Sequence, residues 1–355
     1  MTTDTSFSRL KFLIALLLTN TGRMNIMLDT EIASIVKSVD TYEIAQKTRH
    51  NIALNDNEKI VASQLDEWAR EIGNTGYDEK REIAEFVRKT INEEFYNAPD
   101  ELLDYMFDRG SVGEFDDYET TVTPKNTLIS YEAAKGGNVD KSYLDISVIK
   151  PKWKNRQIET EISYADLRRN GWKSVALLTT YSMDALNNAR FKDIFSDIDT
   201  LIANGAENYI SNGGTVPTAA AMDAMALYLN DRNQGGGVIV ALSKYIQNVS
   251  KLKGFDSEAM RDEVHLNGKL GVYDGCSLYG ISGAKKYGDG TLLMPDKRIF
   301  GIAGKIGTLD MKGDVHIYED MDNDNEKVEL KIKDFTYGWA FNKDTLENVC
   351  KIVTD

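Results

Sequence analysis

The sequence predicts an α+β fold with one long helix and separate sets of β-strands. Three observations support this prediction. Residues 163–204 carry apolar side chains at helical spacing, residues 119–162 and 268–355 are rich in short strand patterns, and residues 1–118 are typical of short acidic helices. The chain has 355 residues, which is enough for one large or two ordinary domains with real cores.

The composition is that of a soluble globular protein, with 42% apolar and 28% charged residues. The net charge of -14 argues against a primary role in binding nucleic acids, because an acidic protein repels the phosphate backbone. Residues 1–120 hold 24 acids and 13 bases, a net charge of -11, whereas the other 235 residues hold 32 acids and 29 bases, a net charge of -3. The first third of the chain is therefore a distinct acidic segment.

Two further features, the cysteines and the most apolar run, bear on the cell compartment in which the protein is made. Cys276 and Cys350 are far apart and form no CxxC pair, which indicates two reduced thiols in a protein made in the cytoplasm. The most apolar run, Phe12–Leu18, is too short for a bilayer, which needs about 20 residues. Arg9 and Lys11 before it mimic a signal peptide, but no small-residue cleavage site follows. A buried N-terminal helix and a docking helix for a neighbour both remain open.

Residues 1–118 contain three predicted helices and no evident chemistry. The first covers 58–72, the second covers 78–96, and the third starts at Pro99 with Asn97 as a possible cap. Apolar residues recur on one face of each of the first two helices, and acidic residues cover their outer faces.

A long hairpin is predicted next, within residues 119–162. Its arms are 127–134 and 141–150, and the glycines of 136–138 suit the positive φ angles of a hairpin turn. The hairpin has too few apolar residues on one side to bury itself, so it needs a partner inside or outside the chain. A further strand is expected at 157–162.

The strongest helix is predicted over 163–204. Ser163 opens it with Asp166 three residues on, Asn204-Gly205 ends it, and Gly171 bends or interrupts it. A continuous helix of this length would be on the order of 60 Å long. Elongated structural subunits need such a helix, and few compact enzymes do. The apolar positions that define it are Leu167, Val175, Leu178, Leu186, Ala189, Ile194, Ile198 and Leu201.

The remaining chain alternates short elements. A helix is expected from Pro217 to about 230, a flexible glycine loop at 235–237, and a buried strand at 238–242. Helices follow at 243–249 and near 256–265. After a turn at 322–325, Val328, Leu330 and Ile332 alternate with charged residues, as in a half-exposed antiparallel strand.

The sequence predicts no catalytic, metal-binding or cofactor-binding residues. His50, His265 and His316 lie in three different segments without ligand spacing, and no nucleophile motif is present. The acidic run 320–326 resembles a calcium loop, but Asn325 and Lys331 stand where that motif needs Gly and Glu. Trp153 lies between two lysines, and we expect it to pack under the hairpin rather than stack on a base.

The order of these elements, together with five local stretches, resembles a known family. The stretches are Val148–Trp153 leading into Gln157–Glu159, then Gly271–Cys276, Leu293–Ile302, Gly313–Asp320 and Phe335–Phe341. Their order and spacing carry the resemblance. Residues 119–355 look like the major capsid fold shared by tailed phages, herpesviruses and encapsulins.

The resemblance implies a division of the chain. Residues 119–162 would be the extended hairpin loop that lies over a neighbouring subunit, and 163–205 the spine helix of the peripheral domain. Residues 206–297 would form the axial domain, and 298–355 the returning strands of the peripheral domain. The departure is residues 1–118, an acidic helical arm or accessory segment. Some relatives carry a scaffold-like segment of this size that a protease removes, but we favour a retained arm.

The resemblance also implies the function. The chain would be a homo-oligomer of hexamers and pentamers, forming an icosahedral shell around packaged double-stranded DNA without sequence-specific binding, cofactor or membrane. It would be assembled in the host cytoplasm and found in the virion. Portal, scaffold or decoration proteins are possible partners, and Lys135 near the loop tip is a candidate for crosslinking to a neighbour. The alternatives are an encapsulin-like shell around a protein cargo, or an enzyme such as a hydrolase that uses the acidic first third.

Overall fold

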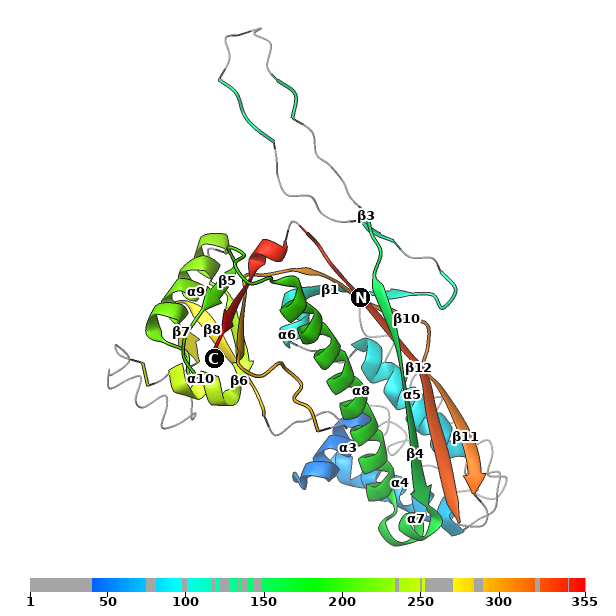
Figure 1. The fold of residues 1–355 in the computed structure, drawn as a ribbon. Helices are drawn as coiled ribbons and strands as arrows, with labels where there is room; N and C mark the ends of the chain where they lie inside the picture. The colour runs from blue at the N-terminus through cyan, green and yellow to red at the C-terminus, as the bar shows by residue number, and fades with distance from the viewer. Residues whose placement is uncertain are drawn as a thin grey trace. The chain divides into compact units, whose positions relative to one another are not determined.

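Figure 1 shows a computed structural model of the chain. It describes residues 40–74, 81–97, 101–116, 119–121, 128–132, 135, 140–142, 148–233, 236–249, 251–252, 271–283, 290–322, 326–343 and 345–354. Five sequence predictions lie wholly or mostly outside these residues: the apolar run 12–18, the hairpin turn at 136–138, the helix at 256–265, the turn at 322–325, and the position of His265. No helix among the described residues is long and apolar enough to cross a membrane.

The chain forms two compact units, and each gathers segments that are far apart in the sequence. The first contains Met1–Ala98, Arg156–Leu186 and Asp314–Phe335, and the second contains Pro99–Asn155, Asn187–Gly313 and Thr336–Asp355.

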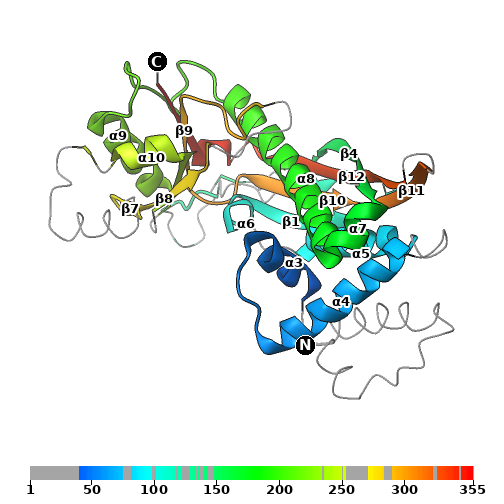
Figure 2. The ribbon, with the colours of Figure 1, turned by 90° about the horizontal axis from the view of Figure 1, so that it is seen from below.

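Helices dominate the first unit. They are α3 (Thr41–His50), α4 (Asp56–Asn74), α5 (Arg81–Asn97), α7 (Tyr164–Asn170) and the first half of α8 (Trp172–Leu201). Figure 2 shows α4, α5 and α7 gathered at one end of α8. The predicted helices at 58–72 and 78–96 are thus confirmed as α4 and α5.

Aromatic rings join these helices. The ring of Phe86 on α5 lies 5.6 Å from that of Trp68 on α4 and 5.4 Å, edge-on, from that of Trp172 on α8. The side chain of Asn92 on α5 both donates to the carbonyl of Val315 and accepts from its N–H, at 3.0 and 2.7 Å. The helices of the acidic segment therefore share one core with residues more than 200 positions away.

One five-stranded sheet contains β1 (Phe107–Val112), β4 (Lys152–Ser163), β10 (Gly307–Lys312), β11 (His316–Asp322) and β12 (Lys327–Phe341). The strand order is β1-β10-β12-β11, with β4 also paired to β12. Within the first unit, β11 and β12 form an antiparallel hairpin in the register Ile317↔Ile332. Val328, Leu330 and Ile332 are fully buried, which confirms the alternation predicted for this strand.

Residues 107–112 correct the sequence analysis, which placed only helices and loops before residue 119. They form β1, which runs parallel to β10 in the register Phe107↔Gly307 to Val112↔Lys312. The preceding helix, α6 (Glu101–Met106), passes directly into this strand. Phe107 is fully buried and its ring contacts that of Phe341 at 5.9 Å. Pairing with a strand 200 residues away therefore decides the conformation, because Phe-Asp-Arg-Gly-Ser-Val has no strand alternation of its own.

The second unit also contains a six-stranded sheet in the order β5-β13-β9-β6-β8-β7. Its central strand, β6 (Val238–Leu242), is buried along almost all of its length, as predicted. β9 (Arg298–Ile302) and β13 (Val349–Val353) pair in this sheet with β6 and β5 (Tyr209–Ser211). The other two strands are β7 (Val272–Tyr273) and β8 (Cys276–Ile281).

Two helices pack on this sheet, as Figures 1 and 2 show. α9 (Ala219–Arg232) is capped by the Thr218 hydroxyl, and α10 (Ser243–Val249) follows β6 directly. Both were predicted within a few residues. The glycine run before β6 was predicted to be a loop, and its described part, 236–237, has no regular secondary structure. The N–H of Gly236 donates to the carbonyl of Asn233 at 2.9 Å, and the carbonyl of Gly237 accepts from Ser277 at 2.8 Å.

The predicted long helix is divided at Gly171 into α7 and α8. Ser163 caps α7 as expected, accepting from the N–H of Asp166 at 3.0 Å. Gly171 has φ +55°, a conformation that L-residues rarely adopt, and a Cβ atom there would overlap the carboxylate of Asp66. That carboxylate instead accepts from the N–H of Trp172 at 3.0 Å, at the start of α8. α8 has 30 residues, so it is about 45 Å long.

Candidate functional site

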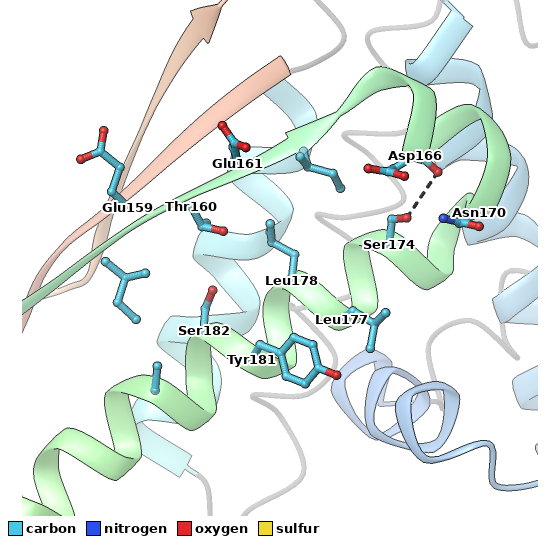
Figure 3. Close-up of a pocket in the computed structure, with 13 residues that line it drawn as sticks. Glu159, Thr160, Glu161, Asp166, Asn170, Ser174, Leu177, Leu178, Tyr181 and Ser182 are labelled. Carbon is cyan, nitrogen blue, oxygen red and sulfur yellow. Dashed lines mark hydrogen bonds between the residues drawn. The ribbon is translucent and has the colours of Figure 1, made fainter. Parts of the chain in front are cut away.

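A groove in the first unit lies between β4 and α8 and is shown in Figure 3. Its volume is about 500 Å³. Thr160 of β4 and Leu178 of α8 point toward one another across it, whereas Glu159 points away from α8. The break at Gly171 creates the groove, because it turns the chain from β4 and α7 back along the strand as α8. The lining residues are Ile158, Glu159, Thr160, Glu161, Ile162, Asp166, Asn170, Ser174, Leu177, Leu178, Tyr181, Ser182 and Ala185.

The groove has apolar walls and a charged rim. Leu177 and Leu178 are half-buried, and Tyr181 is 55% exposed. At the rim, Glu159 pairs with Lys331 at 2.9 Å and Glu161 pairs with Lys327 at 2.6 Å, both across to β12. These paired carboxylates are not arranged for acid–base catalysis, and the groove is suited to contact with another segment of chain.

The second unit presents a long loop between β2 (Thr120–Thr121) and β3 (Val148–Ile149). The two strands pair antiparallel, Thr120↔Ile149 and Thr121↔Val148. The end of the predicted second arm therefore pairs with residues 120–121, which precede the predicted first arm 127–134, and the described residues of that first arm, 128–132, form no strand. Higher up, the N–H of Ile129 donates to the hydroxyl of Ser142 at 3.2 Å. Leu128 and Ile129 are 54% and 63% exposed. An apolar, β-prone stretch that is this exposed is a ready surface for a partner.

A polar network anchors the loop's returning strand, β4, within the second unit. Asp193 of α8 accepts from Lys154 at 2.7 Å and from the hydroxyl of Tyr337 at 2.6 Å. Asp197, one turn on, accepts from Lys152 at 2.8 Å and from the indole N–H of Trp339 at 3.2 Å. The network ties the start of β4 to α8 and β12.

Trp153 is half-buried and packs against β12. Its ring lies on Gly338 of β12, where an added Cβ atom would overlap the indole. Lys312 lies over the ring at 5.4 Å from its centroid.

The candidates for metal and cysteine chemistry stay apart where they can be placed. His50 is exposed on α3, and His316 is half-buried on β11. In the described ranges, no group of three or more His, Cys, Asp or Glu side chains could hold a metal ion. Cys276 and Cys350 are both free and buried, and burial raises the pKa of both thiols, that of Cys350 to about 12. Neither thiol is therefore a ready nucleophile.

The sequence analysis did not identify the groove. The apolar positions of residues 163–204 predicted one long helix, and Leu178 was one of them. In the structure Val175 and Leu186 are buried, whereas Leu178 lines the groove. Apolar spacing shows that a helix face is suited to burial, but it does not show whether the covering segment lies in the same compact unit.

Comparison with known proteins finds the same fold in phage and phage-like capsids. The capsid of an empty GTA particle, computed with C5 symmetry, aligns with a TM-score of 0.52 and 14% identity over 71% of this chain and 89% of that chain. A structure from Gordonia phage Cozz aligns with a TM-score of 0.51 and 10% identity over 70% and 84%. The capsid of a native GTA particle, computed with C5 symmetry, aligns with a TM-score of 0.50 and 14% identity over 69% of this chain and 88% of that chain. No protein-family model matches the sequence, and no curated protein matches it significantly.

The chain therefore has the tailed-phage capsid fold, as the sequence predicted. At these identities, the likeness concerns the fold alone.

Proposed function

We propose that this chain is the major capsid protein of a tailed phage, a non-enzymatic subunit that builds the shell of the virion. The observation that carries the proposal is the fold: the alignment spans most of this chain and 89% of a capsid chain of a GTA particle. The described residues between β2 and β3 support it independently: Leu128, Ile129 and Tyr131 are exposed, and a partner would bury these side chains.

Assembly would proceed through repeated weak contacts. The extended loop would lie across a neighbouring copy, and the loops of the axial segment, 206–297, would meet in rings of five and six. Many such contacts add, so individually weak interfaces give a stable shell through multivalency. An acidic inner face would keep packaged double-stranded DNA from adhering, in line with the net charge of -14. We propose portal, scaffold or decoration proteins as further partners.

We also propose that residues 1–118 stay in the mature shell. Their helices supply Trp68 and Phe86 to the core around Trp172, and β1 is hydrogen-bonded along its length to β10. Removing them would expose a large apolar surface in the first unit and leave an open strand edge in the second. Mass spectrometry of purified shells tests this proposal, because a fragment that starts near residue 110–120 would contradict it.

Purified particles would separate the two shell functions. The contents of particles made in the native host would be DNA for a capsid and a packaged protein for an encapsulin-like compartment. An enzyme with this sequence would instead stay monomeric or form a small oligomer. The groove does not favour that alternative, because the neighbouring carboxylates of Glu159 and Glu161 are both engaged in ion pairs with lysines.

A further inference from the structure

The groove of the first unit has an uncovered apolar wall. Leu177, Leu178, Tyr181 and Ala185 follow one another at spacings of one, three and four on α8, so they form one stripe. The first two are half-buried and the last two are exposed. Tyr181, in the middle of the stripe, keeps 55% of its surface exposed. The stripe therefore indicates a missing covering segment.

The opposite wall offers backbone hydrogen bonds. Among the described residues, β4 pairs with one strand only, β12. Five consecutive residues of β4, Ile158–Ile162, line the groove, so both the inner face and the open edge of the strand border it. An open strand edge beside an apolar stripe is suited to a segment of chain rather than to a small polar ligand.

The charge of the groove favours a cationic occupant. Glu159 and Glu161 are already paired with lysines of β12. Asp166, at the end of the groove where β4 turns into α7, accepts from Ser163 but has no cationic partner in the described part of the chain.

One segment of the chain has the matching chemistry. The first 28 residues hold three basic residues and one acidic residue, at the head of an otherwise acidic third. Two of the basic residues, Arg9 and Lys11, immediately precede the apolar run Phe12–Leu18.

The chain also enters the structure next to the groove. Arg49, at the end of α3, pairs with Asp184 of α8 and lies 4.6 Å from the ring centroid of Tyr181. α3 is about 15 Å long, and the 22 residues 19–40 can span up to about 70 Å when extended. The tether is therefore long enough for residues 9–18 to reach any part of the groove.

We propose that residues 9–18 dock in the groove between β4 and α8 of their own chain. Their apolar side chains cover Leu177, Leu178 and Tyr181, and one of their two cations faces Asp166. Because the segment is tethered, its effective concentration at the groove is on the order of millimolar, so the groove is filled before any other copy approaches. This inference does not depend on the proposed shell function, and it is tested on unassembled protein.

The experiment is disulfide trapping in the full chain. The double variant Leu13→Cys with Ala185→Cys places one thiol in the segment and one in the groove, and both natural cysteines are buried and do not compete. The matched control pairs Leu13→Cys with Ser63→Cys, which is exposed on α4 in the same unit and closer in sequence. After mild oxidation of dilute protein, we expect at least about tenfold more intrachain disulfide in the groove variant than in the control.

Three results would overturn the proposal. One is an equal yield in the two variants. Another is a disulfide that links two chains, which assigns the groove to a second copy's N-terminal segment. The third is a higher disulfide yield between Ala185→Cys and Ile129→Cys than between Ala185→Cys and Leu13→Cys, which assigns the groove to a second copy's extended loop.

Hydrogen exchange gives a second readout that needs no cysteine. In the full chain carrying Leu13→Asp and Leu16→Asp, residues 158–162 and 174–185 should exchange faster, while 238–249 in the other unit should not change. Unchanged exchange in the groove would contradict the proposal. Shell formation, followed separately by microscopy, tests the proposed function, so the two can fail independently.

Discussion

Replacing Phe86 with alanine should strongly destabilise the first unit. The ring is 3% exposed and contacts Trp68 and Trp172 at centroid distances of 5.6 and 5.4 Å. Removing a buried Phe side chain costs about 3–5 kcal/mol, because apolar contact is lost and a cavity remains. The edge-on pair with Trp172 contributes to that cost, since such pairs are worth about 0.5–1.5 kcal/mol beyond their buried area. We therefore expect the free energy of unfolding to fall by about 3–5 kcal/mol.

Urea unfolding of unassembled protein measures this change, with tryptophan fluorescence as the probe because Trp68 and Trp172 flank the mutated site. Ile60→Ala is the matched control: it removes an apolar side chain from α4 that is 38% exposed, and it should cost less than about 1 kcal/mol. If Phe86→Ala also costs less than about 1 kcal/mol, α4 and α5 do not share a core with α8, and the reasoning for a retained N-terminal segment fails.

Three further changes test other parts of the structure. Gly171→Ala should lower the free energy of unfolding by about 1–3 kcal/mol, since φ is positive and the Cβ atom would meet Asp66; an unchanged melting temperature would contradict this. A side-chain hydrogen bond from Lys47 lowers the pKa of Glu58 below 4.5, so its contribution to stability is present above that pH and is lost as the pH falls through the lowered pKa. Glu58→Gln should therefore flatten the acid limb of a stability–pH curve below about pH 4.5, and an unaltered limb would refute the assignment. Ile129→Asp should abolish assembly in a sedimentation assay at an unchanged melting temperature, and normal assembly would show that the loop surface is not an interface.

Local sequence patterns predicted many of the helices and strands correctly. The β-branched run Val238–Leu242 and the alternation of Val328, Leu330 and Ile332 predicted β6 and the first half of β12, because burial on both faces or one face leaves those signatures. The break at Gly171 was predicted as a bend or interruption, since glycine permits the positive φ that ends α7. The order of these elements was enough to identify the fold.

The features that the sequence did not predict depend on contacts between segments that are far apart in the chain. Residues 107–112 are a strand because β10 pairs with them, and no local feature of Phe107–Val112 shows this. The groove likewise depends on which stripe of α8 stays uncovered. Leu178 and Val175 look alike as members of a helical pattern, yet the first lines the groove and the second is fully buried. Spacing predicts faces, and only the packing of distant segments decides which face is left for a partner.

Electron microscopy of the purified full chain, in negative stain over a range of concentrations, tests the central claim most directly. A capsid subunit with this fold should form rings of five or six copies or closed shells as the concentration rises. A uniform monomer at high concentration, with no rings or shells, would contradict the account.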